Sequence, residues 1–219
     1  MAEKKVKKKL FLLDGMALAY RSHFALTNNP RMTTTGMNTS MVFVFTNTLL
    51  EILNKEQPTH LAVVFDTDKP TFRDEIYSEY KAGRESMPED IREGIPYLDR
   101  VLAGFKVPVI RVDGFEADDV IGTLAGEAEK DGFTTYMVTP DKDFAQLVSD
   151  NIKIFKPGRY QFGARQKCRI GCGFSKLVPW AYCQTVVAAI DVVAHPGHEL
   201  WRDSSFMLNC EIGYATSRI

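Results

Sequence analysis

Acidic side chains gather at the start of one predicted helix in this 219-residue sequence. Residues 114–127 carry apolar side chains at spacings of three and four, which predicts an amphipathic helix packed on a core. Its first turn holds three acidic residues within four positions, Glu116, Asp118 and Asp119. A helix N-terminus stabilises carboxylates, so two acids need no further explanation. Three repel one another, and a bound cation accounts for them, although a solvated, well-capped helix start is the plain alternative.

Three short apolar runs elsewhere in the chain also end in aspartate. Residues 9–14 end in Asp14, residues 61–66 end in Asp66, and residues 136–143 end in Asp141 and Asp143. Such runs, bounded by turn residues and followed by helical patterns, predict buried parallel strands, whose carboxyl ends meet at one edge of a sheet. We therefore expect seven carboxylates in one neighbourhood: Asp14, Asp66, Glu116, Asp118, Asp119, Asp141 and Asp143.

These candidate ligands are all oxygen donors, with no histidine or cysteine among them. That set specifies a hard cation, magnesium or manganese, and not zinc. Acidic clusters of this kind commonly hold two metal ions about 3.5–4 Å apart, which bind the attacking and leaving oxygens of a phosphoryl transfer. The predicted substrate is a phosphodiester. Asp119 is expected to lie alongside, either as a ligand or as a support for the ligands.

The elements that must position these residues alternate between strand and helix patterns. Helices are predicted over residues 16–25, 41–53 and 91–105, a loop over residues 28–36, and a further strand over residues 107–112. The fold class is therefore α/β with a mainly parallel central sheet. In the first helix, Arg21 can reach a substrate phosphate, and a surface arginine is an equal alternative.

Residues 71–92 differ from their surroundings, because aromatic and basic side chains interleave there over a sparse apolar face. Rings that stack on bases and cations that neutralise phosphates are what single-stranded nucleic acid requires. The segment follows the strand that ends in Asp66, so it is expected to overhang the acidic cluster, with an exposed helix of mixed charge as the alternative. The candidate DNA-binding residues are Arg21, Arg73, Tyr77, Tyr80, Lys81 and Arg84.

Charge and hydropathy restrict the class of protein further. The net charge of −1 gives no whole-molecule sign of nucleic acid, so any attraction must come from local patches. No apolar run approaches the length of a membrane span. The lysine-rich start leads into an apolar run of only four residues, residues 10–13, which is too short for a signal peptide. These features predict a cytoplasmic protein that does not bind membranes.

Five motifs in this order resemble the 5′ nuclease domain of bacterial DNA polymerase I, from the flap-endonuclease family. They are Leu-Leu-Asp14-Gly, Val-Val-Phe-Asp66, the segment from Phe72-Arg73 to Tyr80-Lys81-Ala-Gly-Arg84, Glu116-Ala-Asp118-Asp119, and Thr-Pro-Asp141-Lys-Asp143. The likeness runs from about residue 9 to residue 159. It implies a three-layer PIN-like, Rossmann-like fold with a helical arch at about residues 71–92.

The resemblance also implies an activity. Members of this family carry out structure-specific, metal-dependent hydrolysis of DNA near a 5′ end in replication and repair. The implied partners are DNA with a 5′ flap or 5′ end and RNA primer–DNA junctions, and the implied cofactor is a pair of Mg²⁺ or Mn²⁺ ions. Tyr80, Lys81 and Arg84 match positions that grip the scissile phosphate, which makes Lys81 and Arg84 the candidate catalytic residues.

The family pattern stops after Arg159. The family continues with a Gly-Asp-x-x-Asp-Asn-Ile-Pro-Gly motif, which adds two metal-site aspartates, then a helix-hairpin-helix and, in the polymerase, a polymerase domain. Residues 160–219 show none of these, and they hold all four cysteines, both tryptophans and only ten charged residues. We therefore expect a nuclease domain over residues 1–159 and a divergent tail over residues 160–219, either a foreign or frameshifted segment or a genuine extension. The second metal site is expected to be impaired.

Four other interpretations account for parts of the sequence. The first is a DNA-binding module whose catalysis is impaired by the tail. The second is a PIN-type ribonuclease of the toxin kind, and the third is a phosphatase that forms an aspartyl phosphate at Asp14, although Met16 breaks the usual Asp-x-Asp pattern. The fourth is a zinc site in the tail, whose ligand spacings are not those of common zinc fingers. Its candidate ligands are Cys168, Cys172, Cys183, His195, His198 and Cys210.

Overall fold

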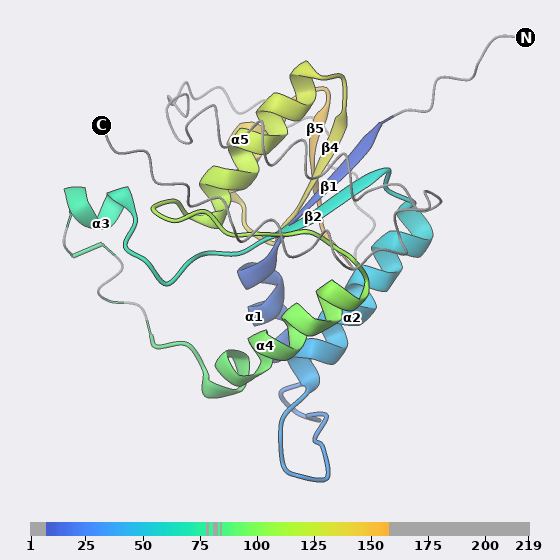
Figure 1. The fold of residues 1–219 in the computed structure, drawn as a ribbon, viewed down its shortest axis with the longest axis vertical. Helices are drawn as coiled ribbons and strands as arrows, with labels where there is room; N and C mark the ends of the chain where they lie inside the picture. The colour runs from blue at the N-terminus through green and yellow to red at the C-terminus, as the bar shows by residue number, and fades with distance from the viewer. Residues whose placement is uncertain (1–7, 78, 81–82, 84, 158–219) are drawn as a thin grey trace, which may run out of the picture.

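The fold rests on a parallel sheet. The computed structural model describes residues 8–157 except 78, 81–82 and 84. Within these residues five parallel strands pair in the order β3-β2-β1-β4-β5 (Figure 1). The strands are β1 (Lys9–Asp14), β2 (His60–Val64), β3 (Val109–Ile110), β4 (Thr134–Val138) and β5 (Ile152–Phe155). The predicted α/β class with a parallel central sheet is confirmed.

Strand β1 lies at the centre of the sheet and is apolar on both faces. Phe11, Leu12 and Leu13 have no exposed surface. Alternate residues of a strand point to opposite faces, so Phe11 and Leu13 enter one core while Leu12 enters the other. A parallel sheet covered on both sides requires such a continuous apolar run.

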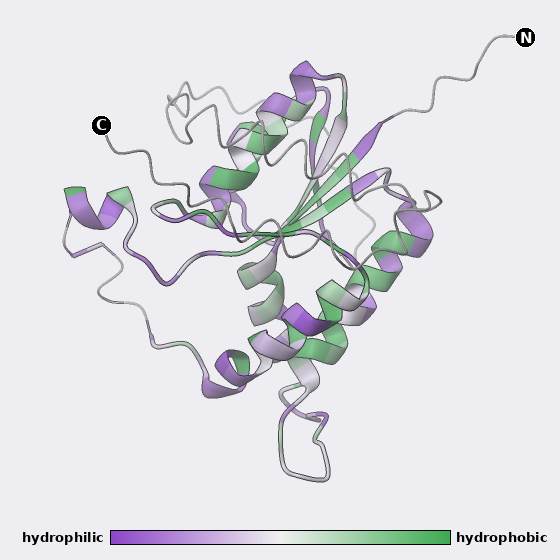
Figure 2. Ribbon diagram, in the orientation of Figure 1, coloured by the Kyte–Doolittle hydropathy of each residue, from purple (hydrophilic) through white to green (hydrophobic). Residues whose placement is uncertain are grey.

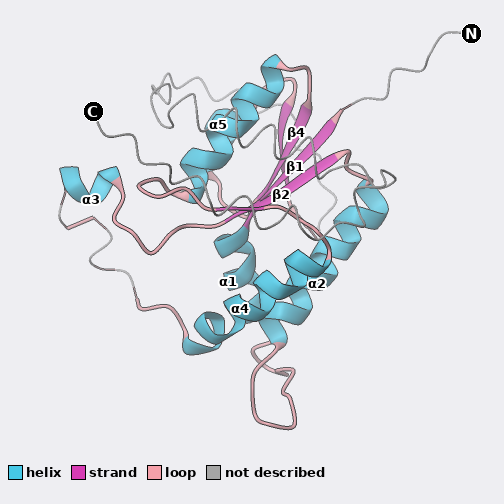
Figure 3. Cartoon of the chain, in the orientation of Figure 1, coloured by secondary structure: helices cyan, strands magenta, loops and turns pink. Residues whose placement is uncertain are grey.

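Helices cover both faces of this sheet (Figures 1 and 3). On one face lie α1 (Gly15–Ala25), α2 (Ser40–Glu51) and α4 (Glu89–Gly104). On the other lies α5 (Ala117–Lys130), whose Ile121 and Leu124 pack on the sheet. In Figure 2 the ribbons of α2, α4 and α5 carry both green apolar and purple polar residues. Apolar side chains between the three layers form two cores, one on each face of the sheet, and these cores hold the sheet edge in place.

Several element boundaries differ from the predictions. The predicted strand over residues 107–112 is reduced to Val109–Ile110, and it begins just after Pro108, which has no N–H to donate to a neighbouring strand. Strand β5 was missed, because its sequence Ile-Lys-Ile-Phe is short and only its first residue is buried. Helix α2 continues as a π-helical turn over Ile52–Glu56, and a 3₁₀ turn spans Asp143–Leu147.

Helical structure covers only part of residues 71–92. Helix α3 spans Phe72–Ile76, and α4 begins at Glu89 after Pro88. The described residues between them form turns or irregular backbone. Lys81, Arg84 and the tail over residues 160–219 lie outside the described residues, so the arch, the tail and its proposed zinc ligands stay predictions. Across the part of the chain that is described, no helix is both long and apolar enough to cross a membrane.

Candidate active site

Three strand ends bring polar side chains to the carboxyl edge of the sheet. Asp14 is the last residue of β1, Asp66 follows β2 by two positions, and Thr139 directly follows β4. The Thr139 hydroxyl donates to Asp14 Oδ2 at 3.0 Å and accepts the Asp141 N–H at 3.2 Å. Asp14 and Asp141 therefore lie at one edge of the sheet, joined through a single hydroxyl.

Asp14 is the most enclosed of the carboxylates at the strand ends, with only 8% of its surface exposed. Burial, reinforced by the negative charges of Asp66 and Asp141, raises its pKa from 3.8 to about 6. Hydrogen bonds from the Ala17 N–H, which Asp14 caps at 3.0 Å, and from Thr139 oppose that rise in pKa. The site thus holds an ionised carboxylate at neutral pH in a place where negative charge is unfavourable.

The acidic start of α5 is tied to the end of β2. Asp66 Oδ1 accepts the Ala117 N–H at 2.7 Å, although the Asp66 side chain is otherwise exposed. On the other side, Gly15 allows α1 to begin against Phe65, because a Cβ at Gly15 would lie 2.6 Å from the Phe65 ring. These two contacts place the beginnings of α1 and α5 on either side of Asp66.

The first turn of α5 concentrates negative charge. Glu116 is buried, with 8% of its surface exposed, and Asp118 is half-buried. Burial, followed by the charges of Asp119 and Glu116, raises the pKa of Asp118, while the Asp119 N–H, which donates to Asp118 Oδ1 at 2.7 Å, and the Arg73 guanidinium oppose the rise. Glu116 and Asp119 are therefore close enough to Asp118 for their negative charges to raise its pKa.

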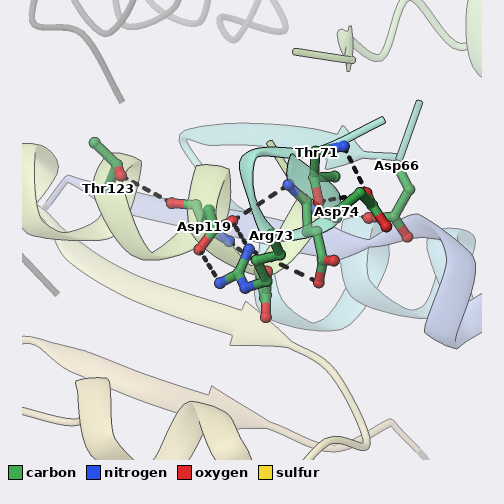
Figure 4. Close-up of polar contacts among 9 residues, drawn as sticks. Asp66, Thr71, Arg73, Asp74, Asp119 and Thr123 are labelled. Carbon is green, nitrogen blue, oxygen red and sulfur yellow. Dashed lines mark hydrogen bonds and ion pairs between the residues drawn. The ribbon is translucent and has the colours of Figure 1, made fainter. Parts of the chain in front are cut away.

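Asp119 is paired with a basic residue from outside the helix (Figure 4). Arg73 of α3 donates from Nη1 to Asp119 Oδ2 at 2.5 Å and from Nη2 to Oδ1 at 2.8 Å. Asp119 has no exposed surface, and the hydrogen bonds to it raise the pKa of Arg73 above its usual range. The sequence placed Asp119 with the metal ligands and Arg73 with the DNA contacts. In the fold, these two residues bind each other.

The seven predicted carboxylates are distributed over two groups. Asp14, Asp66 and Asp141 lie at the strand ends, whereas Glu116, Asp118 and Asp119 share the start of α5. Asp143 is exposed next to the first group, and its N–H donates to Asp141 Oδ1 at 2.9 Å. As the side chains stand, the described residues contain no set of three or more His, Cys, Asp or Glu side chains placed to hold one metal ion.

The predicted DNA-binding residues that are described occupy different surroundings. Arg21 is exposed, and its Nη2 donates to the Pro157 carbonyl at 2.6 Å. Tyr77 is 58% exposed, with its hydroxyl 3.1 Å from a Glu79 carboxylate oxygen. Tyr80 is half-buried, and its N–H donates to the Tyr77 carbonyl at 2.9 Å. Arg21 and Tyr77 are thus open to a ligand, while Arg73 is engaged with Asp119.

Sequence reasoning missed the role of Thr139. Its side chain has no exposed surface, and its hydroxyl bonds to Asp14, 125 positions earlier in the chain, and to Asp141, two positions later. The segment Thr-Pro-Asp marked the end of a strand, but nothing in it indicated a hydroxyl bridge to Asp14. Only the pairing of β1 with β4 makes that bridge possible.

The described residues form a parallel sheet between two helical layers, with acidic residues at its carboxyl edge, which is the PIN-like α/β arrangement expected from the sequence. Residues 9–170 match the sequence profile of the family described as 5′-3′ exonuclease, N-terminal resolvase-like domain. The chain belongs to this family. The match extends past residue 159, where the motifs in the sequence indicated the end of the likeness.

Curated relatives and solved structures agree with this assignment. DNA polymerase I of Bacillus caldotenax is 42% identical over 151 residues, which is 68% of this chain and 17% of the relative. DNA polymerase I of Mycobacterium bovis is 42% identical over 156 residues, 71% of this chain and 17% of the relative. The chain therefore spans about a sixth of the length of these relatives. The resemblance predicted from the five motifs is confirmed.

Similar folds are found among bacteriophage nucleases. The bacteriophage T5 D15 protein co-crystallised with metal ions aligns with a TM-score of 0.53 at 20% identity, covering 68% of this chain and 55% of that one. The T5 5′-exonuclease with bound zinc ions aligns with a TM-score of 0.52 at 19% identity and the same coverage. At this identity, the likeness shows the fold.

Proposed function

We propose that this chain is a metal-dependent 5′ nuclease that cleaves phosphodiesters at 5′ ends or flaps of DNA, including RNA primer–DNA junctions, in the cytoplasm. The observation that carries the proposal is the convergence of Asp14, Asp66 and Asp141 at one sheet edge beside the acidic start of α5. Family membership supports it. A bacteriophage T5 flap endonuclease with this fold, at a TM-score of 0.50 and 20% identity, forms a pseudo-enzyme–product complex with DNA and metal ions.

The donor atoms at this edge fit a hard divalent cation. We assign a first ion to Asp14, Asp66, Glu116 and Asp118, and a second to Asp141 and Asp143. All are oxygen donors, as Mg²⁺ and Mn²⁺ require. Burial, with a smaller contribution from neighbouring carboxylates, raises the pKa of Asp14 and of Asp118, and a bound cation would favour the ionised form of both. When bound, such ions lower the pKa of a water molecule and offset charge on the phosphate. Because the described side chains are not already grouped around one ion, ligand side chains have to move when the metal binds.

The basic and aromatic residues supply the remaining functions of the proposed site. Lys81 and Arg84 stabilise the charge that develops on the scissile phosphate, and Tyr80 positions that phosphate. Arg21 and Tyr77, which are open at the surface, contact the DNA strand near the site.

A DNA-binding module with impaired catalysis is the second candidate. Two observations favour it: the described residues hold no ready three-ligand metal set, and residues 160–219 lack the family motif with two further aspartates. On this view the first ion binds, the second binds weakly, and loss of the duplex clamp reduces phosphate contacts.

Cleavage of a labelled 5′-flap DNA by the full 219-residue chain, titrated with Mg²⁺ and with Mn²⁺, tests the proposal. We expect slow, Mn²⁺-favoured cleavage that a chelator abolishes, with poor preference for flaps over plain single strands. A version with residues 160–219 replaced by the family continuation is expected to be faster and more selective. Binding without cleavage at any metal concentration would support the DNA-binding module, and preferential cleavage of single-stranded RNA would support a ribonuclease.

Thr139→Val tests the hydroxyl bridge between the strand ends. Valine keeps the shape but neither orients Asp14 nor accepts the Asp141 N–H, so we expect a loss of about 10–100-fold in metal affinity or cleavage rate, as for other groups that orient ligands. Thr139→Ser should restore most of it. Thr135→Val is the matched control, because Thr135 lies in β4, the strand that Thr139 follows, and its buried hydroxyl makes no hydrogen bond to a described residue. Equal effects at the two positions would contradict the bridge.

A further inference from the structure

Helix α3 is held to the rest of the fold through few contacts. It has five residues, none of them buried, and it lies apart from the layers of the sandwich (Figure 1). Its Phe72 N–H donates to the Gly114 carbonyl at 3.2 Å, and the Phe72 ring lies 6.0 Å from the ring of Phe115. A second attachment is Arg73, which reaches Asp119. Since no residue of α3 is buried, contacts such as these, and not burial in an apolar core, determine where α3 lies.

Arg73 makes the stronger of the two attachments. Its guanidinium forms two parallel hydrogen bonds to Asp119, lies 4.0 Å from Glu116 Oε2, and stacks over Phe72 at 4.6 Å. The Arg73 side chain is 21% exposed and that of Asp119 is 0% exposed. A bidentate arginine–carboxylate pair fixes orientation as well as distance, and this one is mostly shielded from solvent.

Both oxygens of Asp119 accept hydrogen bonds in this arrangement. Its Oδ1 accepts from Arg73, and its Oδ2 accepts from Arg73 and from the Glu116 N–H at 3.3 Å. A cation at Asp119 would have to share these oxygens with the positive charge of Arg73 and reach a side chain with no exposed surface. For Arg73 to bind a phosphate, it would leave a fully buried carboxylate without its cation, which is strongly unfavourable.

We propose that Arg73 and Asp119 form a positioning pair that fixes α3 against the acidic start of α5, and that neither residue binds the metal ion or the scissile phosphate. This inference rests on the proposed nuclease function. Because α3 directly precedes Tyr77 and Tyr80, the pair determines where the segment with the proposed DNA contacts leaves the metal-binding edge. The pair is thus a structural link between substrate binding and the site of chemistry.

The test compares Arg73→Gln, Asp119→Asn and the double variant in the full chain. We expect each single variant to lower the single-turnover cleavage rate at saturating flap DNA by about 10–100-fold, with the double variant no slower than the worse single one. Hydrogen exchange over residues 71–77 should quicken in all three. Mn²⁺ affinity and flap affinity should stay within about threefold of wild type, since neither ligand nor phosphate contact is lost.

Two results would overturn the inference in favour of the earlier assignments. If Asp119→Asn alone weakens Mn²⁺ binding by about tenfold or more, Asp119 is a metal ligand. If Arg73→Gln alone weakens flap binding, Arg73 contacts DNA. Unchanged hydrogen exchange over residues 71–77 in both variants would show that the pair does not hold α3.

Matched controls distinguish the loss of this particular pair from the loss of a charged residue in general. Lys69 and Asp113 form an exposed ion pair at 2.6 Å between the same two stretches of chain, with side chains 63% and 45% exposed. Lys69→Gln and Asp113→Asn should behave like wild type, because solvent screens such pairs. Arg73→Lys, which keeps the charge but not the fork, should recover part of the rate. If Asp119→Asn fails to fold, the comparison of Arg73→Lys with Arg73→Gln still tests the proposal.

Failure of the proposed function would be recognised separately. If the wild-type chain cleaves no DNA, the nuclease proposal fails, while Mn²⁺ titration and hydrogen exchange still report on the pair. Faster exchange over residues 71–77 with unchanged Mn²⁺ affinity would then support the pair as a device that positions α3 in a binding protein.

Discussion

Asp14→Asn is expected to remove metal-dependent cleavage while making the metal-free protein more stable at neutral pH. A bound metal ion contributes several kcal/mol to stabilising the transition state of phosphoryl transfer. Loss of about 4 kcal/mol lowers the rate by about 10³-fold. The substituted side chain still caps α1, because asparagine and aspartate cap helices about equally well, so the fold of this helix is kept.

The gain in stability follows from the raised pKa of Asp14. The folded state holds the proton more tightly than the unfolded state, since the pKa rises from 3.8 to about 6. The stability that this proton contributes is therefore present below pH 3.8 and is lost as the pH rises to about 6. At pH 7 the ionised carboxylate lowers the free energy of unfolding by about 2–3 kcal/mol, at 1.36 kcal/mol per pKa unit. The neutral amide of Asp14→Asn does not lower the free energy of unfolding in this way.

Denaturant unfolding in a chelating buffer measures this difference. The free energy of unfolding of Asp14→Asn should exceed that of wild type at pH 7, and the difference should vanish towards pH 4. Asp150→Asn is the control, because Asp150 is exposed in the loop before β5, at the opposite edge of the sheet. An inactive Asp14→Asn protein that is also less stable than wild type at neutral pH would indicate a structural role instead.

Lys81→Ala and Arg84→Ala are each expected to lower the single-turnover rate by about 10²–10³-fold, the size of effect seen when one preorganised donor to a developing charge is removed. Binding of flap DNA should weaken far less than the rate falls. A contact that strengthens as charge builds on the phosphate acts mainly on the transition state. Single-turnover cleavage at saturating flap DNA, together with equilibrium binding in a chelator, separates the two effects.

Lys130→Ala is the control for loss of a positive charge. Lys130 is 68% exposed at the end of α5, where it pairs with Glu127 at 2.7 Å. Its removal should leave the cleavage rate unchanged. If Lys81→Ala weakens binding and leaves the single-turnover rate intact, Lys81 serves DNA affinity alone and the proposed catalytic role is wrong.

Local sequence patterns account for most of the fold. The continuous apolar run of β1 requires burial on both faces, and the apolar spacing in α5 requires one buried stripe. The aspartates that follow the runs mark where the strands end. These properties depend on neighbours in the chain, so they can be predicted without knowing which strands pair. Strand β5 was missed because its mixed sequence carries little of that signal.

The sequence by itself therefore determined the class of fold, the family and the acidic character of one sheet edge. Only the tertiary structure decided which polar groups bind which. Thr139 bonds to Asp14 across 125 positions, and Arg73 binds Asp119 across 46. The spacing of residues along a chain carries no information about such pairs, because they depend on strand order and on where α3 meets α5. That is why the sequence indicated the acidic start of α5 but not the pairing of Asp119 with Arg73 there.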